Sequence, residues 1–192
     1  MSTHCAALPL CHARHSQLLI VDTQERLAAH MPKNDLSIAV DNINRLLDTA
    51  KLLGIPIIHT EQNASGLGHT IEAVRKNLPE NTPFSHKTSF SCCTADGFER
   101  SLTEDEHRKQ VVMVGMESHI CILQTASGLQ HWGYQVFVAA DAVVSRNPAN
   151  RDNALARMRG CGIQVTNTES VAFEWLADSS HAHFREVSRL FK

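Results

Sequence analysis

The chain has 192 residues, of which 43% are hydrophobic and 20% charged, which is typical of one globular domain with a full core. Its net charge of −2 provides no basic field for a nucleic acid or an anionic membrane. No apolar run approaches the roughly 20 residues that span a bilayer, and residues 1–15 lack the apolar stretch of a signal peptide. We therefore expect a cytoplasmic protein without a nucleic-acid or membrane partner.

Apolar strands and helical segments alternate along the whole chain. In chain order, we expect strands over residues 17–22, 55–60, 84–87, 111–115, 134–141 and 163–165. We expect helices over residues 34–53, 71–78, 119–132 and 148–159, and again from residue 170. The strands are continuously apolar, which favours a parallel sheet covered by helices on both faces. We predict a single-domain three-layer α/β/α fold with a six-stranded parallel sheet, formed by residues 17–192 behind an N-terminal arm of residues 1–16.

The cysteines are expected to be reduced thiols, because a chain of this size without a signal peptide more often keeps them free. The six are Cys5, Cys11, Cys92, Cys93, Cys121 and Cys161. The histidines and cysteines of the arm have spacings that fit zinc poorly, so we expect a loose segment there and no metal site.

Cys121 is the most informative cysteine, because it lies just after a predicted strand and near the start of a predicted helix. The positive end of a helix favours the thiolate, which is the nucleophilic form. The alternative is a small buried apolar side chain, which is what most free cysteines are. These residues alone leave both interpretations open.

Two further side chains are expected at the same edge of the sheet. Asp22 ends the first predicted strand and Lys87 ends the third. Ligands of parallel sheets bind beyond the carboxyl ends of the strands, where Asp22, Lys87 and Cys121 can share one crevice. A carboxylate can take the proton of a thiol and later return it to a leaving group. An ammonium group lowers the cost of both negative charges.

With these segments in view, the chain resembles the isochorismatase-like cysteine hydrolases, which include nicotinamidases and N-carbamoylsarcosine amidases. Five segments carry the resemblance: residues 19–24, 84–90, 115–121, 140–146 and 165–170. The isochorismatase-domain-containing subgroup is the most similar, through Thr60-Glu61-Gln62 followed by Gly66-Leu67-Gly68.

The resemblance implies a role for each residue of the crevice. It makes Asp22 the proton-transfer acid, Lys87 the third member of the group and Cys121 the nucleophile. It also implies a cis peptide bond at Met116–Glu117 and an oxyanion hole formed by the amides of Glu117 and Cys121. The substrate pocket is expected to include Gln24, Gln62, Phe90 and His119.

The segment after the second predicted strand departs from the nicotinamidase pattern. Residues 60–66 contain no Asp-x-His metal motif, although His59 and His69 flank them. We therefore expect a metal-independent hydrolase without a cofactor, acting on a small amide or related acyl compound through a Cys121 thioester. The alternatives are a non-catalytic binding or scaffold protein and a hydrolase of vinyl ethers. The family resemblance and the apolar C-terminal residues Phe173, Trp175, Leu176 and Phe191 favour a homo-oligomer.

Overall fold

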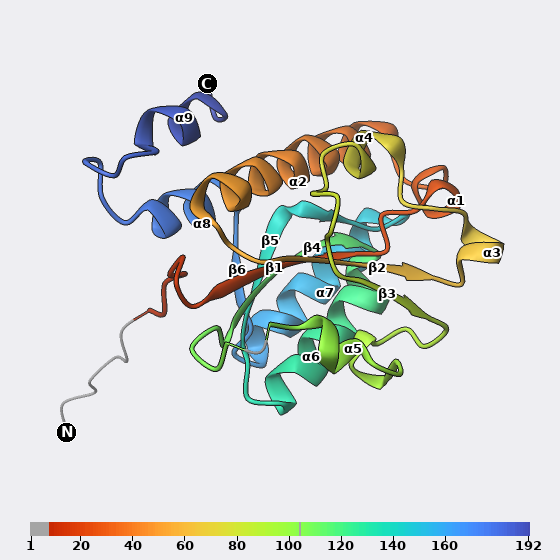
Figure 1. The fold of residues 1–192 in the computed structure, drawn as a ribbon. Coiled ribbons are helices and arrows are strands. Elements are labelled where there is room, and N and C mark those ends of the chain that lie inside the picture. The colour runs from red at the N-terminus through yellow and green to blue at the C-terminus, as the bar shows by residue number, and fades with distance from the viewer. Residues whose placement is uncertain (1–7, 104) are drawn as a thin grey trace.

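The structure is a computed structural model that describes residues 8–103 and 105–192. It contains one sheet of six parallel strands in the order β3-β2-β1-β4-β5-β6 (Figure 1). The strands are β1 (Ser16–Val21), β2 (Ile57–Gln62), β3 (Phe84–Lys87), β4 (Gln110–Met116), β5 (Gln135–Val144) and β6 (Gln164–Thr166). The predicted single-domain α/β/α fold with six parallel strands is confirmed.

Helices cover both faces of the sheet, as Figure 1 shows. The longer ones are α2 (Lys33–Leu53), α6 (Leu123–His131), α7 (Pro148–Gly160), α8 (Thr168–Leu176) and α9 (Phe184–Arg189). The short ones are α1 (Glu25–Ala28), α3 (Ala64–Leu67), α4 (Glu72–Arg75), α5 (Phe98–Ser101), the 3₁₀ turn η1 (Cys92–Thr94) and the π-helical turn η2 (Ser118–Ile122). Helices α2, α4 and α8 lie on one face, and α5, α6 and α7 lie on the other.

The central strands are apolar throughout because both of their faces are buried. Along β1, Leu19 packs in the core under α6 and α7, while Leu18 packs in the core under α2 and α8. Both side chains are completely buried, and full burial of a leucine contributes about 1.5–3 kcal/mol to folding. This pattern is the one that a parallel sheet between two helical layers requires.

The observed elements differ from the expected ones mainly at their ends. Strand β2 begins at Ile57 because Pro56 has no amide hydrogen to donate to a neighbouring strand; only the Pro56 carbonyl forms a hydrogen bond with β1. At its other end, the strand continues to Gln62. Strand β5 continues beyond Asp141 to Val144, through an irregularity that lets Val143 pair with Gly115. The expected helix over 71–78 is only the single turn of α4, and helix α2 begins at Lys33 after Pro32 instead of being capped by Asn34.

The part of the N-terminal arm that the structure describes is held against the domain. The amide of Cys11 donates to Glu174 Oε2 at 2.7 Å, and the amide of His12 donates to Gln110 Oε1 at 2.7 Å. Cys11 is completely buried, so the expected loose segment does not extend to it. His4 and Cys5 lie outside the described residues. No helix among the residues described is long and apolar enough to cross a bilayer.

The strand order places a switch point between β1 and β4. The chain runs from β1 outward to β3, then returns to β4 on the other side of β1 and continues to β6. Connections leave the carboxyl ends of β1 and β4 in opposite directions, which opens a crevice between them. Asp22 follows β1, and η2 with Cys121 follows β4, so both residues border this crevice.

Candidate active site

Asp22 is held in a fixed position at the carboxyl end of β1. Its φ angle of 47° is left-handed, which is uncommon for a residue other than glycine and turns the chain out of the strand. The side chain is completely buried. Thr60 Oγ1 donates a hydrogen bond to Asp22 Oδ1 at 2.7 Å, and Lys87 Nζ donates to Asp22 Oδ2 at 2.6 Å. Both carboxylate oxygens therefore have a partner, one from β2 and one from β3.

Lys87 reaches this carboxylate from the end of the edge strand β3. Its side chain is completely shielded from solvent. Besides Asp22, the ammonium group donates to Gln62 Oε1 at 2.7 Å and to the carbonyl oxygens of Ser89 and Phe90, both at 3.2 Å. Burial is the largest single influence and opposes the charge, but the Asp22 carboxylate together with Cys92 and Cys121 outweighs it and raises the pKa of Lys87 above its ordinary value. Lys87 is therefore a satisfied buried cation.

Cys121 lies on the π-helical turn η2 with only 5% of its surface exposed. Its Sγ is 4.0 Å from Gln62 Oε1. Burial and the nearby Asp22 carboxylate raise the pKa of the Cys121 thiol above its ordinary value, and Lys87 offsets only part of that rise. Both effects oppose the thiolate that a position near a helix start favours. The site instead pairs a thiol with an adjacent carboxylate.

The segment between β4 and Cys121 turns sharply. The Met116–Glu117 peptide bond is cis. The Glu117 carbonyl accepts hydrogen bonds from the amides of both Ile120 and Ile122, which shapes the π-helical turn. The buried Glu117 side chain accepts the backbone amide of Arg146 at 3.0 Å, and the Arg146 guanidinium is 3.5 Å away. These contacts fix the backbone on which Cys121 sits.

Gln24 and Gln62 form a clamp between β1 and β2. The Gln62 amide donates to Gln24 Oε1 at 2.7 Å, while Gln24 Nε2 donates to the carbonyls of Gln62 at 3.0 Å and Gly68 at 2.7 Å. Gln62 Nε2 donates a hydrogen bond to the Thr88 carbonyl at 2.6 Å, and Gln62 Oε1 accepts one from Lys87. Both amide groups are thus engaged within the protein and buried, which differs from the expected substrate contacts.

Phe90 and His119, the other two residues expected in the pocket, lie in different surroundings. The Phe90 side chain is 54% exposed, although its carbonyl contacts Lys87. His119 is half-buried, with Nδ1 3.0 Å from Ser145 Oγ and Nε2 3.4 Å from Asn150 Nδ2. A neutral imidazole with its proton on Nδ1 satisfies both contacts. His119 is therefore turned toward β5 and α7.

Thr60 and Cys92 belong to the site, although neither is among the expected site residues. Cys92 is completely buried, and its thiol lies 3.9 Å from Thr60 Oγ1, which in turn donates to Asp22. Burial raises the pKa of Cys92 from 9.0 to about 12, so this thiol stays protonated. The available signal for Thr60 is strand alternation, because Thr60 and Gln62 are two residues apart and point to the same face of β2. Gln62 is paired with Lys87 in the sheet, so this face leads to the site.

The other face of β2 carries His59 and Glu61. Glu61 Oε1 accepts from the amide of Thr70 at 2.6 Å and from its hydroxyl at 2.8 Å, and Glu61 Oε2 is 3.2 Å from His69 Nδ1. Glu61 thus anchors the segment that follows α3. Within the ranges 8–103 and 105–192, no group of three or more histidine, cysteine, aspartate or glutamate side chains is arranged to hold a metal ion.

A doubly wound sheet with a buried Asp–Lys pair beside a cysteine at the switch point defines the class of isochorismatase-like hydrolases. Comparison with known proteins agrees, because the model of the isochorismatase domain matches residues 16–170. The chain belongs to the isochorismatase family, which is a family of hydrolases.

Three similar proteins cover nearly all of the chain. Isochorismatase family protein 1B of Dictyostelium discoideum is 35% identical over 92% of this chain and 86% of its own. Isochorismatase domain-containing protein 2 of Xenopus laevis is 37% identical over 92% and 83%, respectively. A solved structure of the MAR1 ribonuclease from Caenorhabditis elegans is 35% identical and covers 95% of this chain and 92% of its own, with a TM-score of 0.87.

Proposed function

We propose that the protein is a metal-independent cysteine hydrolase that acts on a small amide or related acyl compound. The observation that carries this proposal is the Asp22 carboxylate, which Thr60 and Lys87 hold in place beside the Cys121 thiol. A fixed base next to a protonated nucleophile is what acyl transfer from a resting thiol requires. The site stands at the switch point, where parallel sheets bind their ligands.

The proposed reaction begins with transfer of the Cys121 proton to Asp22. The thiolate attacks the substrate carbonyl, and the amides of Glu117 and Cys121 stabilise the resulting oxyanion. The protonated Asp22 then gives its proton to the leaving nitrogen, the C–N bond breaks and a thioester remains on Cys121. Asp22 next takes a proton from water, the hydroxide attacks the thioester, and the carboxylic acid leaves as Cys121 recovers its proton.

Lys87 supports these steps without contacting the substrate in this proposal. All of its acceptors are protein oxygens, so its charge serves Asp22. When Asp22 becomes protonated, Lys87 keeps three other acceptors and its position. We infer metal independence from the residues after His59, where Glu61 and Gln62 replace the Asp-x-His pattern.

The choice of a small acyl substrate rests on the thiol and on charge. A nucleophilic cysteine suits acyl transfer better than cleavage of a vinyl ether. The Caenorhabditis elegans protein is described as a ribonuclease, but the net charge of −2 here offers no general attraction for a polyanion. Because Cys121 is only 5% exposed, we also favour a compact substrate over a polymer.

Turnover of a panel of small amides, ureides and esters by the wild type, Cys121→Ala and Asp22→Asn tests the proposal. We expect at least one substrate whose hydrolysis falls about 10²–10⁴-fold in Asp22→Asn and further in Cys121→Ala. Chelation should leave the rate unchanged. Activity that survives in Cys121→Ala would remove the thioester mechanism. Absence of turnover with tight binding of a panel member would instead favour the non-catalytic binding protein.

We further propose that the protein is cytosolic and forms a homo-oligomer. The cytosolic assignment is supported by the free thiols among the described residues, and fractionation of a tagged chain tests it. Oligomer formation is supported by exposed apolar side chains such as Phe173, at 36% exposure. Trp175 and Leu176 do not add to this support because both are core residues. A mass near 21.3 kDa by light scattering would contradict it.

A further inference from the structure

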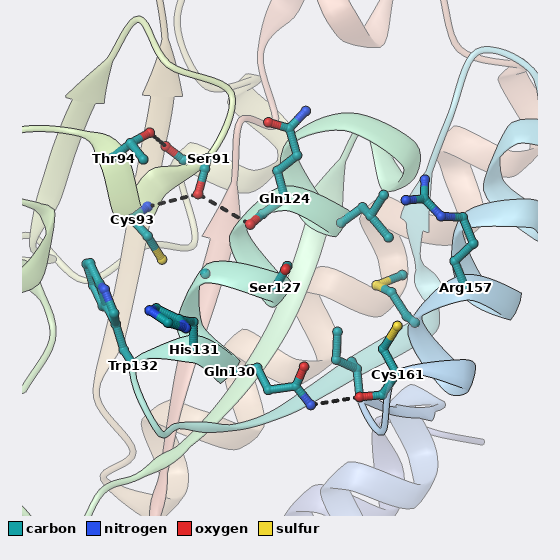
Figure 2. A pocket seen from close by; sticks show the side chains of 14 residues that line it. Ser91, Cys93, Thr94, Gln124, Ser127, Gln130, His131, Trp132, Arg157 and Cys161 are labelled. Atoms are coloured by element: carbon teal, nitrogen blue, oxygen red, sulfur yellow. Dashed lines mark hydrogen bonds between the residues drawn. The ribbon is translucent and has the colours of Figure 1, made fainter.

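A separate groove of about 630 Å³ lies on the outer surface of α6 and α7. Figure 2 shows its walls, with Cys93 and Trp132 on one side, Arg157 and Cys161 on the other, and Ser127 of α6 between them. The catalytic side chains of Asp22, Lys87 and Cys121 are not among the residues that line it. Its volume is within the range of pockets that hold small molecules.

The charge of the groove is positive in a chain whose net charge is negative. None of the fourteen lining residues is an aspartate or glutamate, whereas Arg157 and His131 are both among them. Arg157 makes no ion pair with any residue in the described part of the chain, and it is exposed. A free guanidinium in a hollow without carboxylates attracts an anion and can bind it through two parallel hydrogen bonds.

Uncommitted hydrogen-bonding groups lie along the floor of the groove. Gln124, Ser127 and His131 follow one another on a single face of α6, at intervals of three and four residues. Within residues 8–103 and 105–192, the side chains of Gln124 and Ser127 form no hydrogen bond. They are therefore available to polar atoms of a bound molecule.

The walls supply an apolar surface. Met158 and Ile163 are buried beneath the groove, and the ring of Trp132 is 38% exposed at its rim. Flat rings pack well against an indole. The chemistry of the lining therefore suits a molecule with an apolar, flat body and one negative group.

We propose that this groove is a second ligand site, which binds an organic anion with an aromatic or similarly flat body. Arg157 pairs with the anionic group, and the exposed ring of Trp132 contacts the body of the ligand above the buried Met158 and Ile163. Gln124 and Ser127 complete the polar contacts. The site is independent of the hydrolase mechanism proposed above, because it shares no residue with the catalytic group.

Titration with the dye 1-anilinonaphthalene-8-sulfonate, followed by dye fluorescence, tests the site on the full chain. Arg157→Gln should weaken the dye's affinity roughly tenfold, because it removes a charge-assisted contact. Arg159→Gln is the matched control: it removes the same charge from the exposed surface of α7 outside the groove and should change affinity less than twofold. Ser127→Trp should block binding by filling the floor.

Energy transfer locates the dye, since the chain has only two tryptophans. Dye in the groove should quench Trp132, whereas Trp175 is a buried residue of α8 on the other face of the sheet. Equal affinity of Arg157→Gln and Arg159→Gln, or unchanged binding by Ser127→Trp, would overturn the proposal. Absence of dye binding would also overturn it. If Ser127→Trp then lowers the mass measured by light scattering, the groove is a contact between copies of the chain.

Discussion

Lys87 Nζ lies 2.6 Å from Asp22 Oδ2, and neither side chain has any surface in contact with solvent. The two residues come from strands separated by β2, so the pair also joins the edge of the sheet to its centre. Removing two charges from water is costly, and the hydrogen bonds from Thr60 and to Gln62 offset part of that cost. The pair is therefore stable only as a complete set.

Lys87→Met tests this dependence. The substitution leaves the Asp22 charge buried without its counterion, which typically costs about 3–5 kcal/mol in the free energy of unfolding. Adding Asp22→Asn to the same chain should recover part of that loss. Urea denaturation measures the free energy of unfolding of the wild type, Lys87→Met and the double variant. Lys51→Met, which removes an exposed lysine from its surface pair with Asp48, should cost about 1 kcal/mol or less. Equal losses for Lys87→Met and Lys51→Met would contradict the argument.

Gln62→Leu should separate positioning from substrate binding. The leucine removes an acceptor from Lys87 and leaves the Thr88 carbonyl without its donor, so we expect a stability loss of about 1–3 kcal/mol. In the proposed mechanism Gln62 does not touch the substrate, so kcat should fall while KM stays nearly constant. A rise in KM alone would restore Gln62 to the substrate pocket. Gln130→Leu, which loses one exposed amide contact, is the control.

The sequence predicts the fold well because burial on both faces leaves a direct trace in it. Continuous apolar runs such as 18–21 and 111–114 can be read without knowing their neighbours. Strand order cannot be read that way, and it determines that Thr60 and Gln62 lie beside Asp22. The Gln24–Gln62 clamp therefore could not be predicted from the sequence.

The protonation state of Cys121 was also beyond reach of the sequence. Position near a helix start favours a thiolate, but burial and the charge of Asp22 act in the other direction. Their relative size depends on distances that only the folded chain provides. The structural role of Asp141, at the end of a predicted strand, likewise depends on contacts that only the folded chain provides. In the structure Asp141 accepts hydrogen bonds from both the amide and the hydroxyl of Thr168, at the start of α8.

Gly115→Ala should prevent normal folding. Gly115 has a φ of +117°, and a Cβ atom there would stand 2.0 Å from the carbonyl oxygen of Val21. Because both strands lie at the centre of the sheet, neither can move without opening the crevice between them. We expect a loss of several kcal/mol or aggregation on expression. Gly160→Ala is the control, since a Cβ there meets open space and alanine favours the helix. A Gly115→Ala protein of normal stability would contradict the close packing.

The last prediction concerns the pH dependence of Cys121 alkylation, which needs no substrate. Burial and the Asp22 charge raise the pKa of Cys121 above 9.0, so the wild-type thiol should react slowly with iodoacetamide near neutral pH. Its rate should still be rising above pH 9. Mass spectrometry of the Cys121 peptide measures this rate, with the exposed Cys161 as an internal reference.

Asp22→Asn should move that profile in the direction opposite to its effect on hydrolysis. The amide removes a negative charge that disfavours the thiolate, while the positive charge of Lys87 remains beside the sulfur. The pKa of Cys121 should therefore fall, and a fall of one unit increases the thiolate fraction about tenfold at neutral pH. Alkylation should become faster than in the wild type although turnover is lost, because the base that returns the proton to the leaving group is absent. If the profile stays in place or moves to higher pH, Asp22 does not act on Cys121, and the proposed proton transfer between them is wrong.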